Sequence, residues 1–241
     1  MPESPLETAH DLLVSLAGDG PHTEDPADPS TVQAMQIVLH IPRADPPRRT
    51  DVLDAAARAV VKLCLDPRVA TDPEFRQGLS AWYGHLIRKV VRRARNSAWE
   101  KVQALPGVTV EDSGAQVRAF LPGPVSQVPA EIGKLQISGT ELPRDEPRAI
   151  DDAWPVIYID AGLDMTLGKA AAQVGHASML LAAARPLAWV QWWARGDFML
   201  HVREVATPEF RALAASADAV VVRDAGYTEV APDSVTVVAI A

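Results

Sequence analysis

Three polar side chains that can do chemistry recur along one stretch of the sequence. Lys169, Gln173 and His176 lie within residues 162–178, which follow an apolar strand candidate at 156–159 and run into an alanine-rich segment. On a helix of 3.6 residues per turn, the spacing i, i+4 and i+7 places an amine, an amide and an imidazole on one face. The opposite face is small and apolar and can pack on a sheet. A packing helix needs no such polar row, so the row indicates a site.

Each side chain of the row has a chemical and a structural interpretation. Lys169 lies in the expected first turn of the helix, where backbone N–H groups lack intrahelical partners, so an ammonium there can stabilise an oxyanion or hold a phosphate. His176 is either a general base or a structural histidine, and Gln173 either lines the site or supports it. Neither His-Glu-x-x-His nor clustered-cysteine spacing occurs, so we expect no metal.

The same stretch resembles the signature of the type 2 peptidyl-tRNA hydrolases, in which a strand is followed by Gly-Lys-x-Ala-Ala-Gln-x-x-His-Ala at a helix start. The matching residues are Lys169, Ala171, Ala172, Gln173, His176 and Ala177. Residues 221–238 are similar to that family's Arg-Asp-Ala-Gly-x-Thr hairpin and closing strand. Two separated motifs in the right order are more specific than either alone, and the resemblance covers about residues 155–241.

The resemblance implies a metal-independent hydrolase without a cofactor, which cleaves the ester between peptide and tRNA in peptidyl-tRNA and so recycles tRNA. It implies that Lys169, Asp224 and Thr228 are catalytic, with Asp224 pairing with Lys169 or orienting water. It also implies that Gln173, His176 and Thr236 line the substrate site. The alternative interpretation of Asp224 is a turn residue before Gly226, and without the resemblance a threonine in a strand is more often a packing residue.

Two positions depart from the family pattern. At the end of the strand the chain has Asp160-Ala-Gly-Leu163, where the family usually has Arg-x-Asp-Leu, and it has Leu167 where a basic residue is common. Both exchanges remove positive charge beside the helix start, and arginines at 43, 48 and 49 could replace it if the first half folds over the site. The alternatives to the hydrolase are a catalytically weakened relative that binds tRNA or protein, and a hydrolase of another aminoacyl or peptidyl ester.

Composition sets limits on the class of protein. The net charge of −8 disfavours a nucleic-acid partner at first, but residues 1–30 hold seven acidic residues and no Lys or Arg, so the remainder is nearly neutral. The single cysteine, Cys64, excludes an internal disulfide and fits a reducing, cytoplasmic location. No apolar run approaches the length of a membrane span, so we expect no membrane contact. A homodimer or an internal pseudo-dimer remains open.

The order of the expected elements predicts an α/β fold. We expect a three-layer α/β/α-type domain with a mixed sheet at 155–241, preceded by a smaller or degenerate α/β lobe at 31–138. Residues 1–30 are interpreted as an acidic flexible tail that can begin with a short helix, and 139–154 as a linker. Turn residues at 112–114 predict a hairpin over 107–121.

A long helix is expected from about 73 to 105, between Pro73 and Pro106. On such a helix Arg88, Arg92 and Arg95 share one face, which is either a solvated surface or a track for tRNA phosphates that belongs to the substrate-binding residues.

Two hypotheses relate the halves of the chain. The family continues after its last signature strand with Pro-Gly-Pro, a helix and a short strand, whereas this sequence ends there and carries similar residues at 120–137. Either the first half is a degenerate second copy, which predicts two similar lobes related by a pseudo-twofold axis. Or residues 122–138 complete the second domain, as in a circular permutation, which predicts that they pack into the second sheet.

Overall fold

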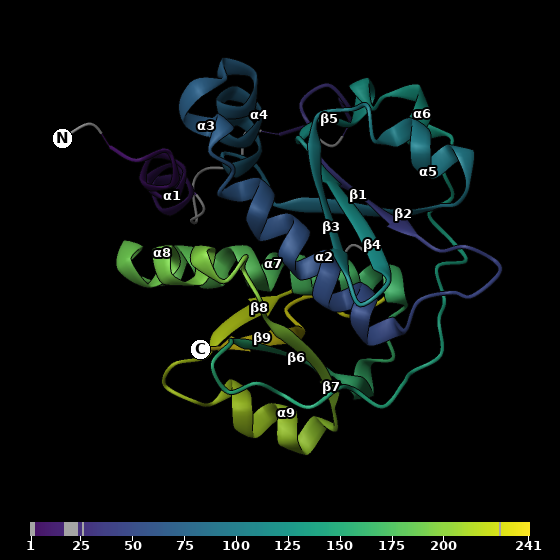
Figure 1. Cartoon of the computed structure of the whole chain (residues 1–241), viewed down its shortest axis with the longest axis vertical. Helices are drawn as coiled ribbons and strands as arrows, with labels where there is room; N and C mark the ends of the chain where they lie inside the picture. Colours follow the sequence, from purple (N-terminus) through teal and green to yellow (C-terminus); the bar gives the residue numbers. More distant parts are fainter. Residues whose placement is uncertain (1–2, 17–23, 26, 227) are drawn as a thin grey trace.

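The structure is a computed structural model that describes residues 3–16, 24–25, 27–226 and 228–241. Two mixed β-sheets lie one above the other in Figure 1, with long helices between them and shorter helices on the outer faces. The alternation of strands and helices in the sequence predicts such an α/β fold, and that expectation is confirmed.

The N-terminal half forms the upper sheet of Figure 1, with strand order β2-β1-β4-β3 and the short β5 on β1. Strand β1 is buried along almost its whole length, because helices cover both faces of the sheet. The elements in chain order are α1 (Pro5–Leu16), β1 (Gln33–His40), α2 (Arg49–Cys64), α3 (Arg68–Thr71), α4 (Pro73–Tyr83), β2 (Arg88–Ala94), α5 (Ser97–Val102), β3 (Gly107–Asp112), β4 (Ala115–Phe120), β5 (Gly123–Pro124), the 3-10 helix η1 (Val125–Gln127) and α6 (Ala130–Gly133).

The C-terminal half forms the lower sheet, with strand order β7-β6-β9-β8. Residues 139–154 connect the halves and contain no helix or strand. The elements are β6 (Val156–Asp160), the 3-10 helix η2 (Ala161–Leu163), α7 (Leu167–Ala184), α8 (Leu187–Arg195), β7 (His201–Val205), α9 (Thr207–Ala214), β8 (Val220–Arg223) and β9 (Val235–Ile240).

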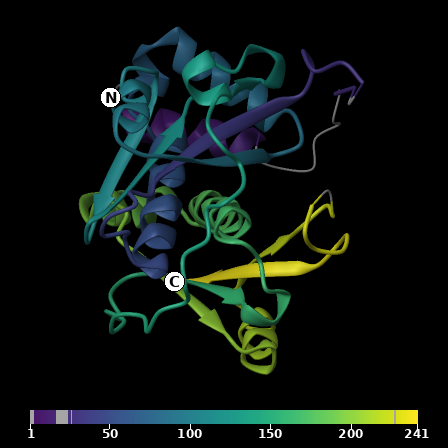
Figure 2. The same cartoon turned by 90° about the vertical axis from the view of Figure 1, so that its right-hand side faces the viewer.

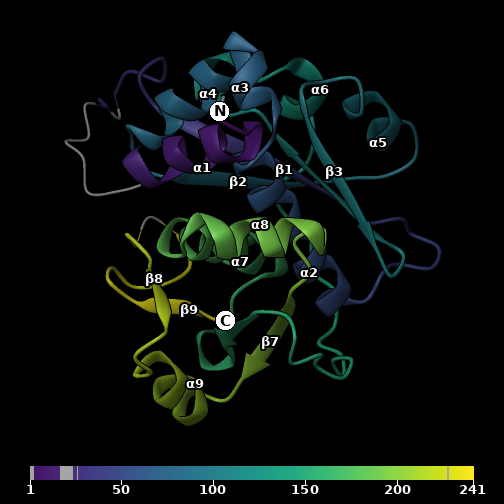
Figure 3. The same ribbon diagram turned by 60° about the vertical axis from the view of Figure 1, so that its left-hand side comes forward.

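Helices α2 and α7 pack against each other in the middle of the molecule. Their apolar residues and the inner faces of both sheets form one continuous hydrophobic core. Helix α9 lies outside the lower sheet, and α5 and α6 enclose a smaller core on the outer face of the upper one. Figures 2 and 3 show the same order of layers from two further directions. The two halves are therefore parts of one packed body.

The long helix expected at 73–105 is wrong. Helix α4 ends at Tyr83 with Gly84 as its C-cap, and the basic stretch that follows is strand β2, which pairs in parallel with β1. A strand side-chain period of two replaces the helical period, so Arg88 and Arg92 share one face and Lys89 lies on the other. Arg95 follows the end of the strand. The expected common face of three arginines does not form.

The short helix expected near the start of residues 1–30 is present as α1, but this part of the chain is not a flexible tail. Helix α1 is packed, with Ala9 and Leu13 fully buried, and the His10 ring nitrogen Nε2 lies 3.0 Å from the carbonyl oxygen of Ala182 in α7. Residues 1–2, 17–23 and 26 of this prediction lie outside the described residues.

The two sheets have matching topology and matching register. In each, a central strand pairs in parallel with the strand that follows its helices and antiparallel with the last strand. Ile37 lies opposite Ala119 in β4, and Ile157 lies opposite Ala239 in β9, so both partners are displaced by the same number of residues. The pairs Val108–Ala119 and Val220–Ala239 extend the match to the hairpins. A degenerate copy requires this arrangement.

The contact between α2 and α7 has the exchange pattern of a twofold interface. Ser178 Oγ of α7 lies 2.8 Å from the carbonyl oxygen of Ala57 in α2, and a Cβ added to Gly175 would lie 2.7 Å from Val60 Cγ2. Residues 57 and 60 of α2 have the same spacing as residues 175 and 178 of α7. Residue 57 contacts residue 178, and residue 60 contacts residue 175. Such mutual contacts define an isologous interface.

The circular-permutation hypothesis is wrong. Gly123 and Pro124 pair with β1, and Gln136 forms an isolated bridge with Arg93 of β2. Residues 122–138 therefore complete the N-terminal sheet and not the C-terminal one.

Candidate active site

The start of α7 is fixed by a side-chain cap. Thr166 is the N-cap residue, and its Oγ1 accepts a hydrogen bond from the backbone N–H of Lys169 at 3.1 Å. Leu167 is fully buried in the central core. This anchoring directs the Lys169 side chain towards the loop that joins β8 to β9.

Five of the residues expected at the site lie in one hydrogen-bonded chain. Lys169 Nζ donates to Asp224 Oδ2 at 2.6 Å and to Thr228 Oγ1 at 2.9 Å. Gln173 Nε2 donates to the same Asp224 oxygen at 2.6 Å, and the fully buried Thr236 donates from its hydroxyl to Gln173 Oε1 at 2.7 Å. Because the Lys169 and Asp224 side chains are each only 10% exposed, their ion pair is less screened than a surface pair.

The turn after β8 holds Asp224 in place. Its Oδ1 accepts from the backbone N–H of Gly226 at 2.8 Å, and its own N–H donates to the carbonyl oxygen of Ser234 at 2.9 Å. Gly226 has a φ of +78°, and an added Cβ would lie 2.5 Å from the Pro232 ring. Glycine is needed here both for the backbone angle and for the close approach. The aspartate is thus a turn residue and a site residue together.

The helix N-terminus already has internal partners. The Thr166 N–H donates to Glu229 Oε2 at 2.9 Å, and the Gly168 N–H donates to Thr140 Oγ1 at 3.2 Å. The expectation that these backbone groups are free for a ligand is therefore wrong at these positions. A carboxylate from the β8–β9 loop occupies the place where an anion is favoured by the helix dipole.

His176 takes no part in the hydrogen-bonded chain. Burial lowers the pKa of its imidazole well below the ordinary value, and the charge of Lys89 lowers it further. The ring is therefore neutral near pH 7, and its position favours the structural interpretation of the sequence.

The three arginines expected to bind substrate are separated by the structure. Arg88 forms an ion pair with Glu24. Arg92 donates to Gln36 Oε1 at 3.1 Å and to the carbonyl oxygen of Leu135 at 2.9 Å, and it lines a cleft of about 630 Å³ that also contains Thr166 and Glu229. Arg95 does not line this cleft. Arg92 is thus the member of the predicted set that lies beside the start of α7.

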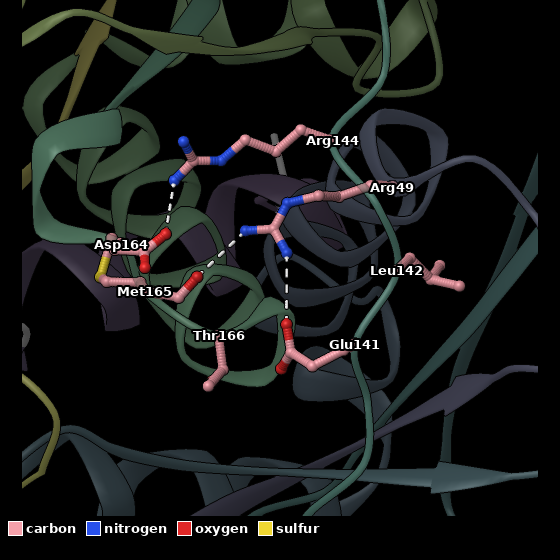
Figure 4. A pocket seen from close by; sticks show the side chains of 7 residues that line it. All are labelled: Arg49, Glu141, Leu142, Arg144, Asp164, Met165 and Thr166. Atoms are coloured by element: carbon pink, nitrogen blue, oxygen red, sulfur yellow. Dashed lines mark hydrogen bonds and ion pairs between the residues drawn. The ribbon is translucent and has the colours of Figure 1, made fainter.

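A second cleft, of about 450 Å³, shares Glu141 and Thr166 with the first (Figure 4). Its arginines are engaged in contacts within the protein. Arg49, only 3% exposed, donates to Glu204 Oε2 at 2.9 Å and to the carbonyl oxygen of Met165 at 3.1 Å, and Arg144 donates to Asp164 Oδ1 at 3.1 Å. Arg49 therefore reaches the loop before α7 as a structural clamp.

The residues that depart from the family pattern do not face Lys169. The Asp160 carboxylate accepts from the Gly162 N–H at 2.9 Å and from the Thr207 hydroxyl at 2.6 Å, at the start of α9. Leu167 points into the core. Neither side chain places a negative charge at the site.

Lys89 was not expected near the site, because the sequence placed it on a basic helix. Burial lowers the pKa of its amine to about 7, and the nearby charges of Asp224 and Lys169 also act on it. The β-branched pair Val90–Val91 was the signal that this segment is a strand. Glu229 and Thr140 were missed as well, since neither belongs to a motif.

Within the described ranges, no cluster of three or more His, Cys, Asp or Glu side chains could hold a metal ion. None of the helices described is long and apolar enough to cross a membrane.

Comparison with known proteins identifies the segment that carries these residues. The family model described as peptidyl-tRNA hydrolase PTH2 matches residues 155–241. No curated protein and no solved structure matches the chain. The matched segment runs from just before β6 to the end of β9 and includes Lys169, Asp224 and Thr228. Residues 155–241, which are less than half of the chain, are therefore similar to the peptidyl-tRNA hydrolase PTH2 family.

Proposed function

We propose that the protein hydrolyses the ester bond between peptide and tRNA in peptidyl-tRNA. The observation that carries the proposal is the contact of Lys169 Nζ with both Asp224 Oδ2 and Thr228 Oγ1. These contacts lie in the segment that matches the family. The substrate is an ester, so its hydrolysis requires a positioned water, an acceptor for the proton of that water and donors for the developing oxyanion.

Lys169 supplies the oxyanion donor. An ammonium group has three N–H bonds, and two of them point at Asp224 and Thr228. The third can meet the carbonyl oxygen of the ester as negative charge develops on it. The contact is strengthened because the pair is 10% exposed and therefore poorly hydrated.

Asp224 orients the water and accepts its proton, which then passes to the ribose oxygen of tRNA as the bond from that oxygen to the acyl carbon breaks. Its Oδ2 is held by Lys169 and Gln173, so the remaining lone pairs of Oδ1, beside the Gly226 N–H, can accept from water. Gln173 cannot turn freely, because buried Thr236 donates to its amide oxygen. Gln173 and Thr236 therefore act as positioning residues behind the carboxylate.

The tRNA side of the substrate is assigned to the cleft beside the helix start. Arg92 and Thr166 line it, and an arginine can neutralise a backbone phosphate. Glu229 lies in the same cleft and holds Thr166, so the phosphate of a bound tRNA would have to displace its carboxylate.

Release of peptide from purified peptidyl-tRNA tests the proposal. We expect the wild-type protein to release peptide, and Lys169→Ala and Asp224→Ala to be reduced at least about 100-fold, as for the loss of an oxyanion donor. Lys62→Ala is the matched control, because Lys62 Nζ also lies 2.6 Å from a carboxylate oxygen, that of Asp197, away from the site. It should hydrolyse at the wild-type rate.

Background rates in all four proteins would reject the proposal. Binding of tRNA without turnover would then favour the alternative of a weakened, binding relative. Hydrolysis of another aminoacyl or peptidyl ester, without hydrolysis of peptidyl-tRNA, would favour the alternative that the protein is a hydrolase of such an ester.

A further inference from the structure

Lys89 is a buried amine supplied to the site region by the other half of the chain. It lies in β2, which contacts α7, and its Nζ is shielded from solvent without a hydrogen-bond partner among the described residues. The ring centroid of Trp82 lies 5.4 Å from Lys89 Nζ. An ammonium buried without a paired anion is costly, so the group favours its uncharged form.

The matching position in the C-terminal half carries no amine. In the upper sheet Val90 lies opposite Gln36 and Val91 opposite Ile37, and in the lower sheet His201 and Val202 take the corresponding places opposite Val156 and Ile157. The residue before each pair is Lys89 in β2 and Leu200 just before β7. Leu200 is 1% exposed in the core. The corresponding position of the lower sheet is thus filled by a buried apolar side chain.

The corresponding site of the N-terminal half has lost its amine. Pairing 57 with 175 and 60 with 178, as the helix contact requires, places Asp51 of α2 at the position of Lys169. Asp51 accepts from Arg148 of the linker at 3.0 Å, and Arg58 donates to Asp112 Oδ2 at 2.7 Å. Asp112 at the end of β3 corresponds to Asp224, which directly follows β8. The N-terminal half therefore has a carboxylate at this turn as well, but it forms an ion pair with Arg58.

Several titratable groups act on Lys89 or pack around it. Burial is the first cause of its lowered pKa, Cys64 and Asp224 oppose the shift, and Lys169 adds to it. The groups are Cys64 of α2, Tyr83 of α4, Lys169 and His176 of α7, and Asp224 after β8. Because burial raises the pKa of Cys64 to about 11 and also raises that of Tyr83, both are neutral near pH 7. Asp224 and Lys169 are then the charges that respond to a change at Lys89.

We propose that the N-terminal half is a degenerate copy that takes the place of a second subunit and supplies Lys89 to the site. Lys89 is a positioning residue, and it must be uncharged for Asp224 to keep its catalytic position beside Lys169. When Lys89 binds a proton, a second ammonium competes for Asp224 and repels Lys169. The carboxylate then loses the position in which it orients water. This role rests on the proposed ester hydrolysis, whereas the ionisation of Lys89 does not.

The pH dependence of the rate distinguishes this role from a purely structural one. Peptide release is measured from pH 5.5 to 8.5 for wild type, Lys89→Met, Lys89→Arg and the control His176→Asn. We expect the wild-type kcat to fall about tenfold per pH unit below the pKa of Lys89, since the charged form is inactive. Lys89→Met has no group to titrate, so its acid limb should move down by about one pH unit or more. His176→Asn should keep the wild-type limb.

Lys89→Arg carries a permanent charge and should be reduced at least about tenfold at pH 8, while circular dichroism verifies that it is folded. An unshifted acid limb in Lys89→Met would overturn the proposal. So would a folded Lys89→Met protein that is inactive at every pH, since the amine itself would then be required.

A separate titration keeps this inference distinct from the hydrolase proposal. NMR of protein labelled at lysine ε-carbons and aspartate carboxyl carbons follows Lys89 and Asp224 without substrate. We expect one lysine signal that titrates near pH 7 and is missing in Lys89→Met, with a step in the Asp224 signal at the same pH. If wild type releases no peptide but both steps occur, the hydrolase proposal fails alone. If no lysine titrates below pH 9, the Lys89 inference fails whatever the activity.

Discussion

Lys89→Met should change how the stability of the protein depends on pH. The amine has a pKa of about 7 when folded, against 10.5 for an ordinary lysine. Between these values the unfolded chain binds a proton that the folded protein does not, so the free energy of unfolding rises with pH. Below pH 7 both states are charged, and this contribution no longer changes. Methionine has a similar length and does not titrate.

The slope follows from the size of the shift. One pH unit corresponds to about 1.4 kcal/mol per proton, and at pH 7 the folded amine is still half protonated, so wild type should gain about 2.3 kcal/mol from pH 7 to pH 9 relative to Lys89→Met. The window ends at pH 9 because Cys64 and Tyr83 have raised pKa values, and their contributions lower the free energy of unfolding at higher pH in both proteins. At pH 7 the variant should be the more stable protein.

Urea unfolding followed by tryptophan fluorescence at pH 7, 8 and 9 measures this difference. The chain has six tryptophans, several of them packed in the core, so the signal reports on global unfolding. Parallel profiles for the two proteins would refute the reasoning, because they would mean that Lys89 remains charged in the folded state.

Three further variants test other contacts. Thr236→Val leaves the buried amide oxygen of Gln173 without its donor, so we expect a loss of about 1–3 kcal/mol in urea unfolding and a lower kcat; unchanged values would show that the contact is dispensable. Gly175→Ala places a methyl group against Val60 and should cost about 1–3 kcal/mol, which Val60→Ala should partly restore; additive losses would argue against the close approach of α2 and α7. Arg92→Glu should weaken tRNA binding and flatten its salt dependence, and an unchanged salt slope would remove Arg92 from the substrate site.

The residues of the polar row could be placed from the sequence because helical spacing is local. Lys169 and Gln173 are one turn apart, and both reach the same oxygen of Asp224. The i, i+4 relation alone puts them on one face. Helical spacing cannot place Asp224, because it lies far from both residues in the chain. Its contact with them was expected only from the resemblance of the hairpin motif.

The contribution of β2 could not be placed in the same way. Lysine and arginine are good helix formers, and the segment lies between two prolines, so local propensity favoured a helix. The segment forms a strand because it pairs with β1, and this pairing depends on residues far away in the sequence. Because a helix was expected, Lys89 was placed on a solvated face, whereas its amine is buried in a strand that contacts α7.

The likeness of the two halves was expected from the sequence only as one of two hypotheses. Asp51 replaces the amine of α7, and the loop after β1 differs from the loop after β6, so the motif does not recur. The strand registers of the two sheets nevertheless match.

Single-turnover hydrolysis of peptidyl-tRNA, with the protein in excess, tests the central claim most directly. The rate constants are compared for wild type, Lys169→Met, Asp224→Asn and the double variant. Because the two side chains share one contact of 2.6 Å, we expect each single change to lower the rate at least about 100-fold and the second change to add less than about tenfold. Equal rates in wild type and Lys169→Met would contradict the account.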